Sequence, residues 1–126
     1  MSYWYLATPY SKHPDGIDEA YRQACRQTAI LYEALIPVFC PIAHSHGVAI
    51  FGGLDPLDHT IWMPADKPMM AAAHGLIVCK LAGWESSYGV WQETRYFRHA
   101  NKPIVYMDPG HLPDEKLLFG EDALWP

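Results

Sequence analysis

The residues best suited to chemistry lie in one segment, Gly83-Trp84-Glu85-Ser86-Ser87-Tyr88-Gly89, and at Glu93 just beyond it. Ser86 or Ser87 is a typical N-cap for a following helix, whose free N–H groups favour a negatively charged ligand. Glu93 shares a helical face with Gly89, and helical side chains lean back toward the N-terminus. We therefore expect its carboxylate to lie over Gly89, where no side chain blocks a ligand, and to stay ionised as a nucleophile or a base.

A pair of histidines, His44 and His46, is a second candidate. With Asp55, Asp58 and His59 downstream they offer imidazole and carboxylate ligands to a metal. Residues two apart point the same way only on extended backbone, and no glutamate sits beside them as in a metalloprotease helix. We expect ordinary hydrogen bonding, no bound metal and no cofactor, with His44 at the edge of a pocket that follows the preceding strand.

Four short apolar runs indicate the strands that must position these residues. They span Tyr3–Ala7, Pro37–Cys40, Gly75–Cys79 and Ile104–Met107. Helical periodicity predicts helices from Ile17 to Leu35, from about Ala65 to His74 with Pro68 in the first turn, from Tyr88 to Ala100, and from Asp114 to Phe119. The glycine-containing stretch from Ile42 to His59 is expected to be a long functional loop.

Strands that alternate with helices predict a three-layer α/β fold. We expect a parallel sheet of four to five strands with helices on both faces. Ligands bind such sheets beyond the carboxyl ends of the strands, at the point where the strand order reverses. The loops after the first and third strands are therefore the expected site.

Composition limits the partners. The 126 residues fit one domain, residues 1–126, and the net charge of −5 argues against nucleic-acid and membrane partners, which need a basic surface. Three cysteines, no CxxC pair and no signal peptide indicate free thiols in the cytoplasm. A 50% hydrophobic share beside 18% charged residues leads us to expect a homo-oligomer, a dimer or tetramer.

Four sequence features occur along the chain in the order found in a known superfamily. They are Tyr5-Leu6-Ala7-Thr8-Pro9-Tyr10, then Asp66, then Leu76-Ile77-Val78, then Gly83-Trp84-Glu85-x-Ser87-x-Gly89-x-x-x-Glu93. Together they resemble the nucleoside 2-deoxyribosyltransferase superfamily, and most closely small bacterial and phage domains with a Gly-Trp-Glu-x-Ser-x-Gly-x-x-x-Glu signature.

The resemblance implies a flavodoxin-like sheet and cleavage of the N-glycosidic bond of a deoxynucleoside or deoxynucleotide. It places Glu93 on the family's nucleophile, which attacks C1′ of the sugar, and Asp66 on a carboxylate that contacts or protonates the departing base. The substrate-binding residues that it and the loop positions indicate are Thr8, Pro9, Tyr10, Ser11, His44, Gly83, Trp84, Glu85, Ser87 and Gly89. The first loop has no glycine-rich phosphate cradle, so the need for a 5′-phosphate is left open.

Two other functions fit the same residues. One is a nucleotide- or nucleotide-sugar-binding module that kept the pocket without the chemistry. The other is a metal-dependent hydrolase built on His44 and His46. Free base released from a deoxynucleoside separates the first of these from an enzyme.

Overall fold

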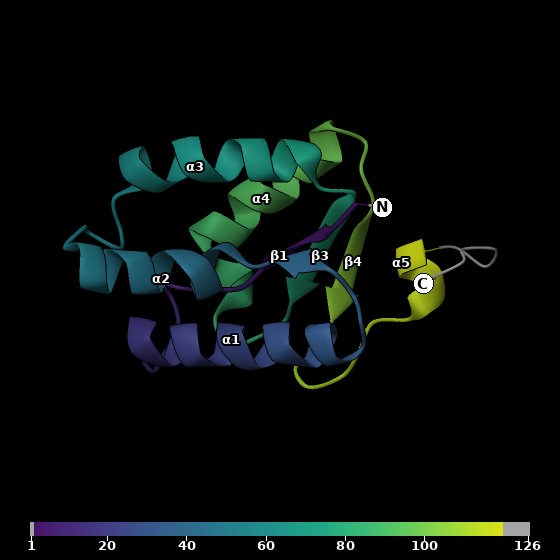
Figure 1. The fold of residues 1–126 in the computed structure, drawn as a ribbon, viewed down its shortest axis with the longest axis horizontal. Coiled ribbons are helices and arrows are strands. Elements are labelled where there is room, and N and C mark those ends of the chain that lie inside the picture. Colours follow the sequence, from purple (N-terminus) through teal and green to yellow (C-terminus); the bar gives the residue numbers. More distant parts are fainter. Residues whose placement is uncertain (1, 120–126) are drawn as a thin grey trace.

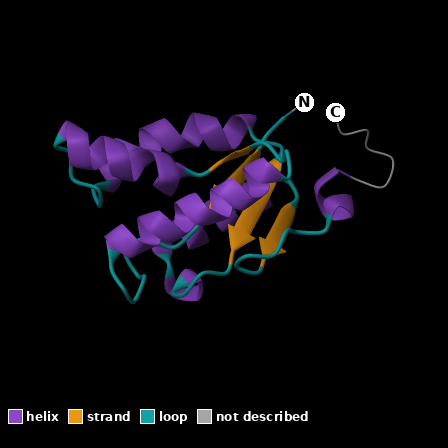
Figure 2. Ribbon diagram, turned by 60° about the horizontal axis from the view of Figure 1, so that its bottom comes forward, coloured by secondary structure: helices purple, strands orange, loops and turns teal. Residues whose placement is uncertain are grey.

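Four apolar segments form one parallel sheet in the computed structural model, which describes residues 2–119. They are β1 (Trp4–Ala7), β2 (Val38–Phe39), β3 (Gly75–Cys79) and β4 (Ile104–Met107), and all run in one direction (Figure 2). The strand order is β2-β1-β3-β4. Every residue of β1 and β3 is buried, which explains why both strands are continuously apolar instead of alternating. All four predicted strands are confirmed to within one residue at each end.

Side chains of the central strands alternate between two layers of helices. Trp4 and Leu6 face α1 (Ile17–Glu33) and α5 (Glu115–Phe119), whereas Tyr5 and Ala7 face α3 (His59–Ala72) and α4 (Tyr88–His99). Figure 1 shows α1 on one side of the sheet and both α3 and α4 on the other. The predicted arrangement with helices on both faces is therefore confirmed.

The stretch predicted as a long loop after β2 is instead a helix, α2 (Pro41–Gly52). Pro41 occupies the first turn, where its fixed φ suits a helix and its missing N–H costs nothing. Gly53 ends the helix in the left-handed conformation, with φ of 70° and its N–H donating to the Ala49 carbonyl. The helix was not recognised because its apolar residues lie all around it and glycines stand inside it, so no amphipathic stripe is present.

Helix α3 begins at His59, six residues before the predicted start at Ala65. The Asp58 side chain caps it by accepting a hydrogen bond from the Thr60 N–H at 3.0 Å. Pro64 and Pro68 both lie inside the helix, not in its first turn. Both are exposed and four residues apart, so the carbonyls that their missing N–H groups leave unpaired lie on the solvent side. Among the described helices, none is long and apolar enough to cross a membrane.

The strand order reverses between β1 and β3. The chain passes from β1 to β2 on one side and then to β3 on the other. Sheets with this order bind ligands at the carboxyl ends of those two central strands. Thr8 to Ser11 and the segment from Gly83 to Gly89 follow these two ends, so the fold brings the two predicted site segments to the same edge.

Candidate active site

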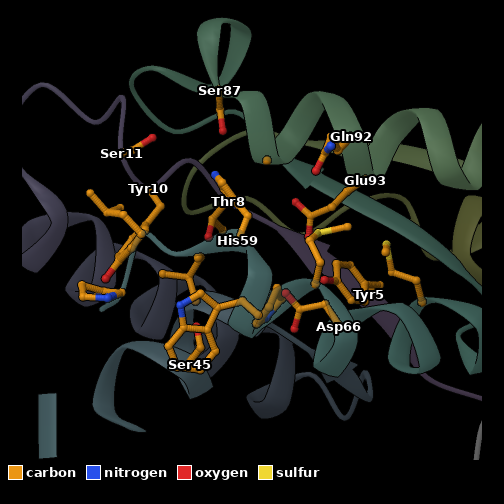
Figure 3. Close-up of a pocket in the computed structure, with 18 residues that line it drawn as sticks. Tyr5, Thr8, Tyr10, Ser11, Ser45, His59, Asp66, Ser87, Gln92 and Glu93 are labelled. Atoms are coloured by element: carbon orange, nitrogen blue, oxygen red, sulfur yellow. The ribbon is translucent and has the colours of Figure 1, made fainter. Parts of the chain in front are cut away.

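A cavity of about 90 Å³ opens at the carboxyl ends of β1 and β3 (Figure 3). That volume is several times the space that one water needs, so the cavity can take part of an organic ligand. Both predicted catalytic residues line it, as do five of the predicted binding residues: Thr8, Tyr10, Ser11, Ser87 and Gly89.

Two carboxyl groups share one end of the cavity. Glu93 points into it from α4 and Asp66 from α3, and Tyr5 reaches the same end from β1 (Figure 3). Burial raises the pKa of Glu93 from 4.5 to about 8, and the negative charge of Asp66 adds to the rise. Burial also raises the pKa of Asp66 from 3.8 to about 6, although the nearby His44 opposes this shift.

Burial therefore opposes the ionised state predicted for Glu93, because removing water from around the carboxylate costs free energy. At neutral pH the pair holds one proton, since one group ionises near pH 6 and the other near pH 8.

The Tyr5 hydroxyl lies beside this pair. The side chain is fully buried, and its hydroxyl has no partner at hydrogen-bonding geometry among the described residues. It is nevertheless near enough to Glu93 to lower the pKa of that group, while burial and the two carboxylates raise the pKa of the phenol itself. The Tyr5 hydroxyl is therefore a third polar group at this end of the cavity, beside Glu93 and Asp66.

Ser87 and Gly89 shape the start of α4. The Ser87 hydroxyl accepts a hydrogen bond from the Val90 N–H at 3.2 Å, which confirms Ser87 as the N-cap. A Cβ built on Gly89 would meet nothing nearer than the Ser87 hydroxyl at 4.0 Å. The space over Gly89 is thus open toward the cavity, as the spacing predicts.

Gly83 has a structural task. Its φ is 89°, and a Cβ there would lie 2.5 Å from the carbonyl oxygen of Lys12. The loop after β3 can therefore press against the loop after β1 only with glycine at this position. Gly83 does not line the cavity, but it holds together the two loops that carry Ser11 and Ser87.

Trp84 and Glu85 lie outside the cavity. They line a shallow groove on the other side of α4, together with Arg95, Arg98 and the Tyr106 ring, which meets Trp84 edge-on at 5.9 Å. Glu85 is exposed there. Pro9 is also absent from the lining, because it is fully buried in the core. The structure therefore places Pro9, Trp84 and Glu85, like Gly83, outside the cavity.

Tyr10 stands at the opposite end of the cavity from Tyr5 (Figure 3). Its hydroxyl lies 2.6 Å from Nδ1 of His46, and Nε2 of the same imidazole lies 3.2 Å from Oδ1 of Asp18. His46 is buried and stacks on the Tyr21 ring at 4.3 Å. Thr8, also buried, has its hydroxyl 3.9 Å from the Cys40 sulfur.

The two histidines do not form a metal site. Both lie on α2, where residues two apart point in different directions. His46 contacts Tyr10 and Asp18, whereas His44 is exposed, lies 6.1 Å from the Phe39 ring and is not on the cavity lining. No group of three or more potential metal ligands occurs within residues 2–119. This geometry does not support the alternative of a metal-dependent hydrolase built on His44 and His46.

Sequence reasoning missed the apolar wall of the cavity. Pro41, Ile42 and Ser45 come from α2 and could not be placed while that segment was expected to be a loop. His59, Trp62 and Met63 come from the first turns of α3, which lie before the predicted start of the helix. The Asp58-x-Thr60 capping pattern was the signal that marked this earlier start.

One family model matches the chain. Residues 2–109 match the family described as Domain of unknown function (DUF1937), and this range holds the whole sheet and both carboxyl groups of the cavity. No curated protein matches the chain. The chain belongs to the DUF1937 family.

Proposed function

We propose that this DUF1937 protein cleaves the N-glycosidic bond of a 2-deoxynucleoside or deoxynucleotide, with Glu93 as the nucleophile. The observation that carries the proposal is the pair of desolvated carboxyl groups, Glu93 and Asp66, at one end of a single cavity. The resemblance of the Gly83-to-Glu93 segment to nucleoside 2-deoxyribosyltransferases supports the choice of substrate.

The reaction proceeds in two steps of the retaining type. In the first, a Glu93 oxygen bonds to C1′ while the bond from C1′ to the base nitrogen breaks, and Asp66 gives its proton to the departing base. In the second, water or another base attacks C1′ and returns its proton to Asp66, and the Glu93 carboxylate leaves. A 2-deoxy sugar suits this chemistry because the cation-like carbon forms more easily without the electron-withdrawing 2′-hydroxyl.

The chemistry needs one carboxylate and one carboxylic acid at the start. The pair carries a single proton between about pH 6 and about pH 8. This proton favours Glu93, whose pKa is the higher of the two. Bound substrate must therefore shift it to Asp66, and the Tyr5 hydroxyl is placed to favour the ionised form of Glu93.

The wall of the cavity suits an aromatic base. Pro41 and Ile42 of α2 and Trp62 and Met63 of α3 all line it, so it offers apolar surface from two helices to a flat ring. Asp66 comes from the same helix as Trp62, one turn further along, so a base held by this wall lies beside the proposed acid.

The test is incubation of the protein with a panel of 2′-deoxynucleosides and their 5′-monophosphates, with free base measured by chromatography. We expect base release by the wild type and its loss by about a thousandfold or more in Glu93→Gln, which keeps the shape of the side chain. Glu33→Gln, at an exposed carboxylate on α1, is the matched control and should act like the wild type.

Two results would contradict the assignment. Base release that persists in Glu93→Gln would show that Glu93 is not the nucleophile. Binding of a nucleotide without release of base from any member of the panel supports the non-catalytic binding module instead, and calorimetry measures that binding directly.

We also propose that the chain self-associates. Exposed apolar side chains gather along α2 and just after it, and Phe51 is 94% exposed. The others are Val48, Ile50, Leu54 and Leu57. Light scattering should report a dimer or tetramer for the wild type and a smaller species for Phe51→Glu; a monomeric wild type would refute the proposal.

A further inference from the structure

The hydroxyl of Tyr10 has a fixed hydrogen-bonding role. The Asp18 carboxylate can only accept, so an imidazole with a single proton holds it on Nε2, 3.2 Å from Oδ1 of Asp18. Nδ1 is then an acceptor, and it faces the Tyr10 hydroxyl at 2.6 Å. Tyr10 therefore donates its only proton to His46. Its oxygen can offer nothing but lone pairs to a ligand in the cavity.

The surroundings hold this arrangement in place. His46 is 4% exposed and stacks on Tyr21 with an angle of 19° between the rings. The imidazole also meets the Tyr10 ring edge-on at 5.7 Å. An imidazole stacked on one ring, in edge contact with another and held at both nitrogens cannot turn to free the Tyr10 proton without losing contacts.

The charge of the cavity also favours an uncharged ligand group over a phosphate. Its lining contains Glu93 and Asp66 but neither lysine nor arginine, and the exposed His59 is the one basic side chain there. A phosphate monoester has no proton to donate to Tyr10 near neutral pH and would meet negative charge at the other end. A sugar hydroxyl can donate to Tyr10 and carries no charge.

We propose that Tyr10, held by His46 and Asp18, recognises a hydroxyl group of the sugar, and that the cavity takes an unphosphorylated deoxynucleoside in preference to its 5′-monophosphate. This inference rests on the proposed function. Tyr10 is the specificity-determining residue, and Asp18 and His46 are positioning residues that act through it.

The first measurement compares kcat/KM for a deoxynucleoside and its 5′-monophosphate at pH 7.5 in the wild type. We expect the nucleoside to be favoured by about tenfold or more, because a site that must accept a hydrogen bond rejects a group that cannot donate one. Equal use of the two, or preference for the monophosphate, overturns the inference while the proposed glycosidic cleavage stands.

Asp18→Asn tests the hydrogen-bond direction without touching the cavity, because Asp18 is 71% exposed and lies outside the lining. The amide can donate to Nε2 of His46, which moves the imidazole proton to Nδ1 and frees the Tyr10 hydroxyl to donate. We expect the preference for the nucleoside to fall by about threefold to tenfold, with KM changed more than kcat. Asp15→Asn, at an exposed aspartate in the neighbouring loop, should leave it unchanged. An unchanged ratio in Asp18→Asn refutes the role of the network.

Tyr10→Phe identifies which sugar hydroxyl Tyr10 recognises. Paired substrates with and without the 3′-hydroxyl, and with and without the 5′-hydroxyl, should differ in KM for the wild type, and the variant should lose this difference for one pair by about tenfold. Loss for neither pair overturns the assignment of Tyr10.

If no substrate is cleaved, the proposed function has failed and binding decides the inference. Calorimetry with Glu93→Gln, a deoxynucleoside and its 5′-monophosphate then supplies the ratio. Tighter binding of the nucleoside supports the recognition of an uncharged sugar; tighter binding of the monophosphate, or of neither ligand, refutes it.

Discussion

Two tyrosines at opposite ends of the cavity have opposite surroundings. The Tyr5 hydroxyl is fully buried beside two carboxyl groups and lacks a partner at hydrogen-bonding geometry among the described residues. The Tyr10 hydroxyl lies 2.6 Å from His46, which is held in turn by Asp18. One end of the cavity therefore holds a hydroxyl beside two carboxyl groups without a fixed hydrogen bond, and the other holds a hydroxyl whose hydrogen-bond partner is fixed. We therefore expect chemistry at the first end and recognition at the second.

The largest effect on activity should come from the end of the cavity that holds the two carboxyl groups. Asp66→Asn removes the proposed acid, so we expect base release to fall by about 10²–10⁴-fold. Steady-state kinetics on an ordinary deoxynucleoside measures this loss. A substrate with an N7-methylated purine needs little help from an acid, because its base leaves without being protonated first, and on this substrate the variant should recover most of the rate. An equal loss on both substrates would assign Asp66 a structural role.

The free energy of unfolding should also reveal the cost of ionising Glu93 in the folded state. Folding raises the pKa of Glu93 from 4.5 to about 8, so the folded state binds this proton more tightly than the unfolded chain. The resulting stabilisation is complete below pH 4.5 and is lost as the pH rises toward 8. Glu93→Gln cannot ionise and should be more stable than the wild type at pH 8 by roughly 2–4 kcal/mol, with the difference disappearing near pH 4. Urea unfolding at several pH values measures it, and parallel curves would contradict the shift.

The rate should depend on pH in a bell-shaped manner. Below about pH 6 both carboxyl groups are protonated and no nucleophile is available; above about pH 8 both are ionised and no acid remains. We expect kcat/KM to fall about tenfold for each pH unit beyond either limb. Tyr5→Phe removes a group that lowers the pKa of Glu93, so its alkaline limb should move to higher pH. A limb that does not move would separate Tyr5 from the pair.

The smallest effect is the most direct comparison, because one substitution is made at both ends. At pH 5, where Glu93 is protonated, Tyr5→Phe deletes a buried hydroxyl that has no partner at hydrogen-bonding geometry among the described residues, so it should stabilise the protein by about 1 kcal/mol. Tyr10→Phe leaves Nδ1 of His46 without its partner and should destabilise it by about 1 kcal/mol. Thermal unfolding of the two variants reports the signs, and equal signs would remove the contrast between the two ends.

The sheet could be predicted from the sequence because β1, β3 and β4 have strong local signals. Each is a short run of apolar residues between turn residues, and burial on both faces demands that pattern. That Glu93 and an unobstructed Gly89 line the same cavity followed from helix geometry alone. Both inferences use a spacing of four residues or fewer.

What the sequence did not reveal depends on contacts between distant segments. Helix α2 carries no amphipathic stripe, so local periodicity could not identify it. The raised pKa of Glu93 depends on burial and on Asp66, which lies 27 residues earlier on another helix, so the spacing around Glu93 could not reveal it. The partner of Tyr10 lies 36 residues away on that unrecognised helix.

The close approach of Gly83 to the Lys12 carbonyl also limits how the site can be altered. The two loops pack so closely that a side chain at position 83 would clash with that oxygen. A designer who exchanges the loop after β1 for one of another shape must therefore exchange the segment that begins at Gly83 with it.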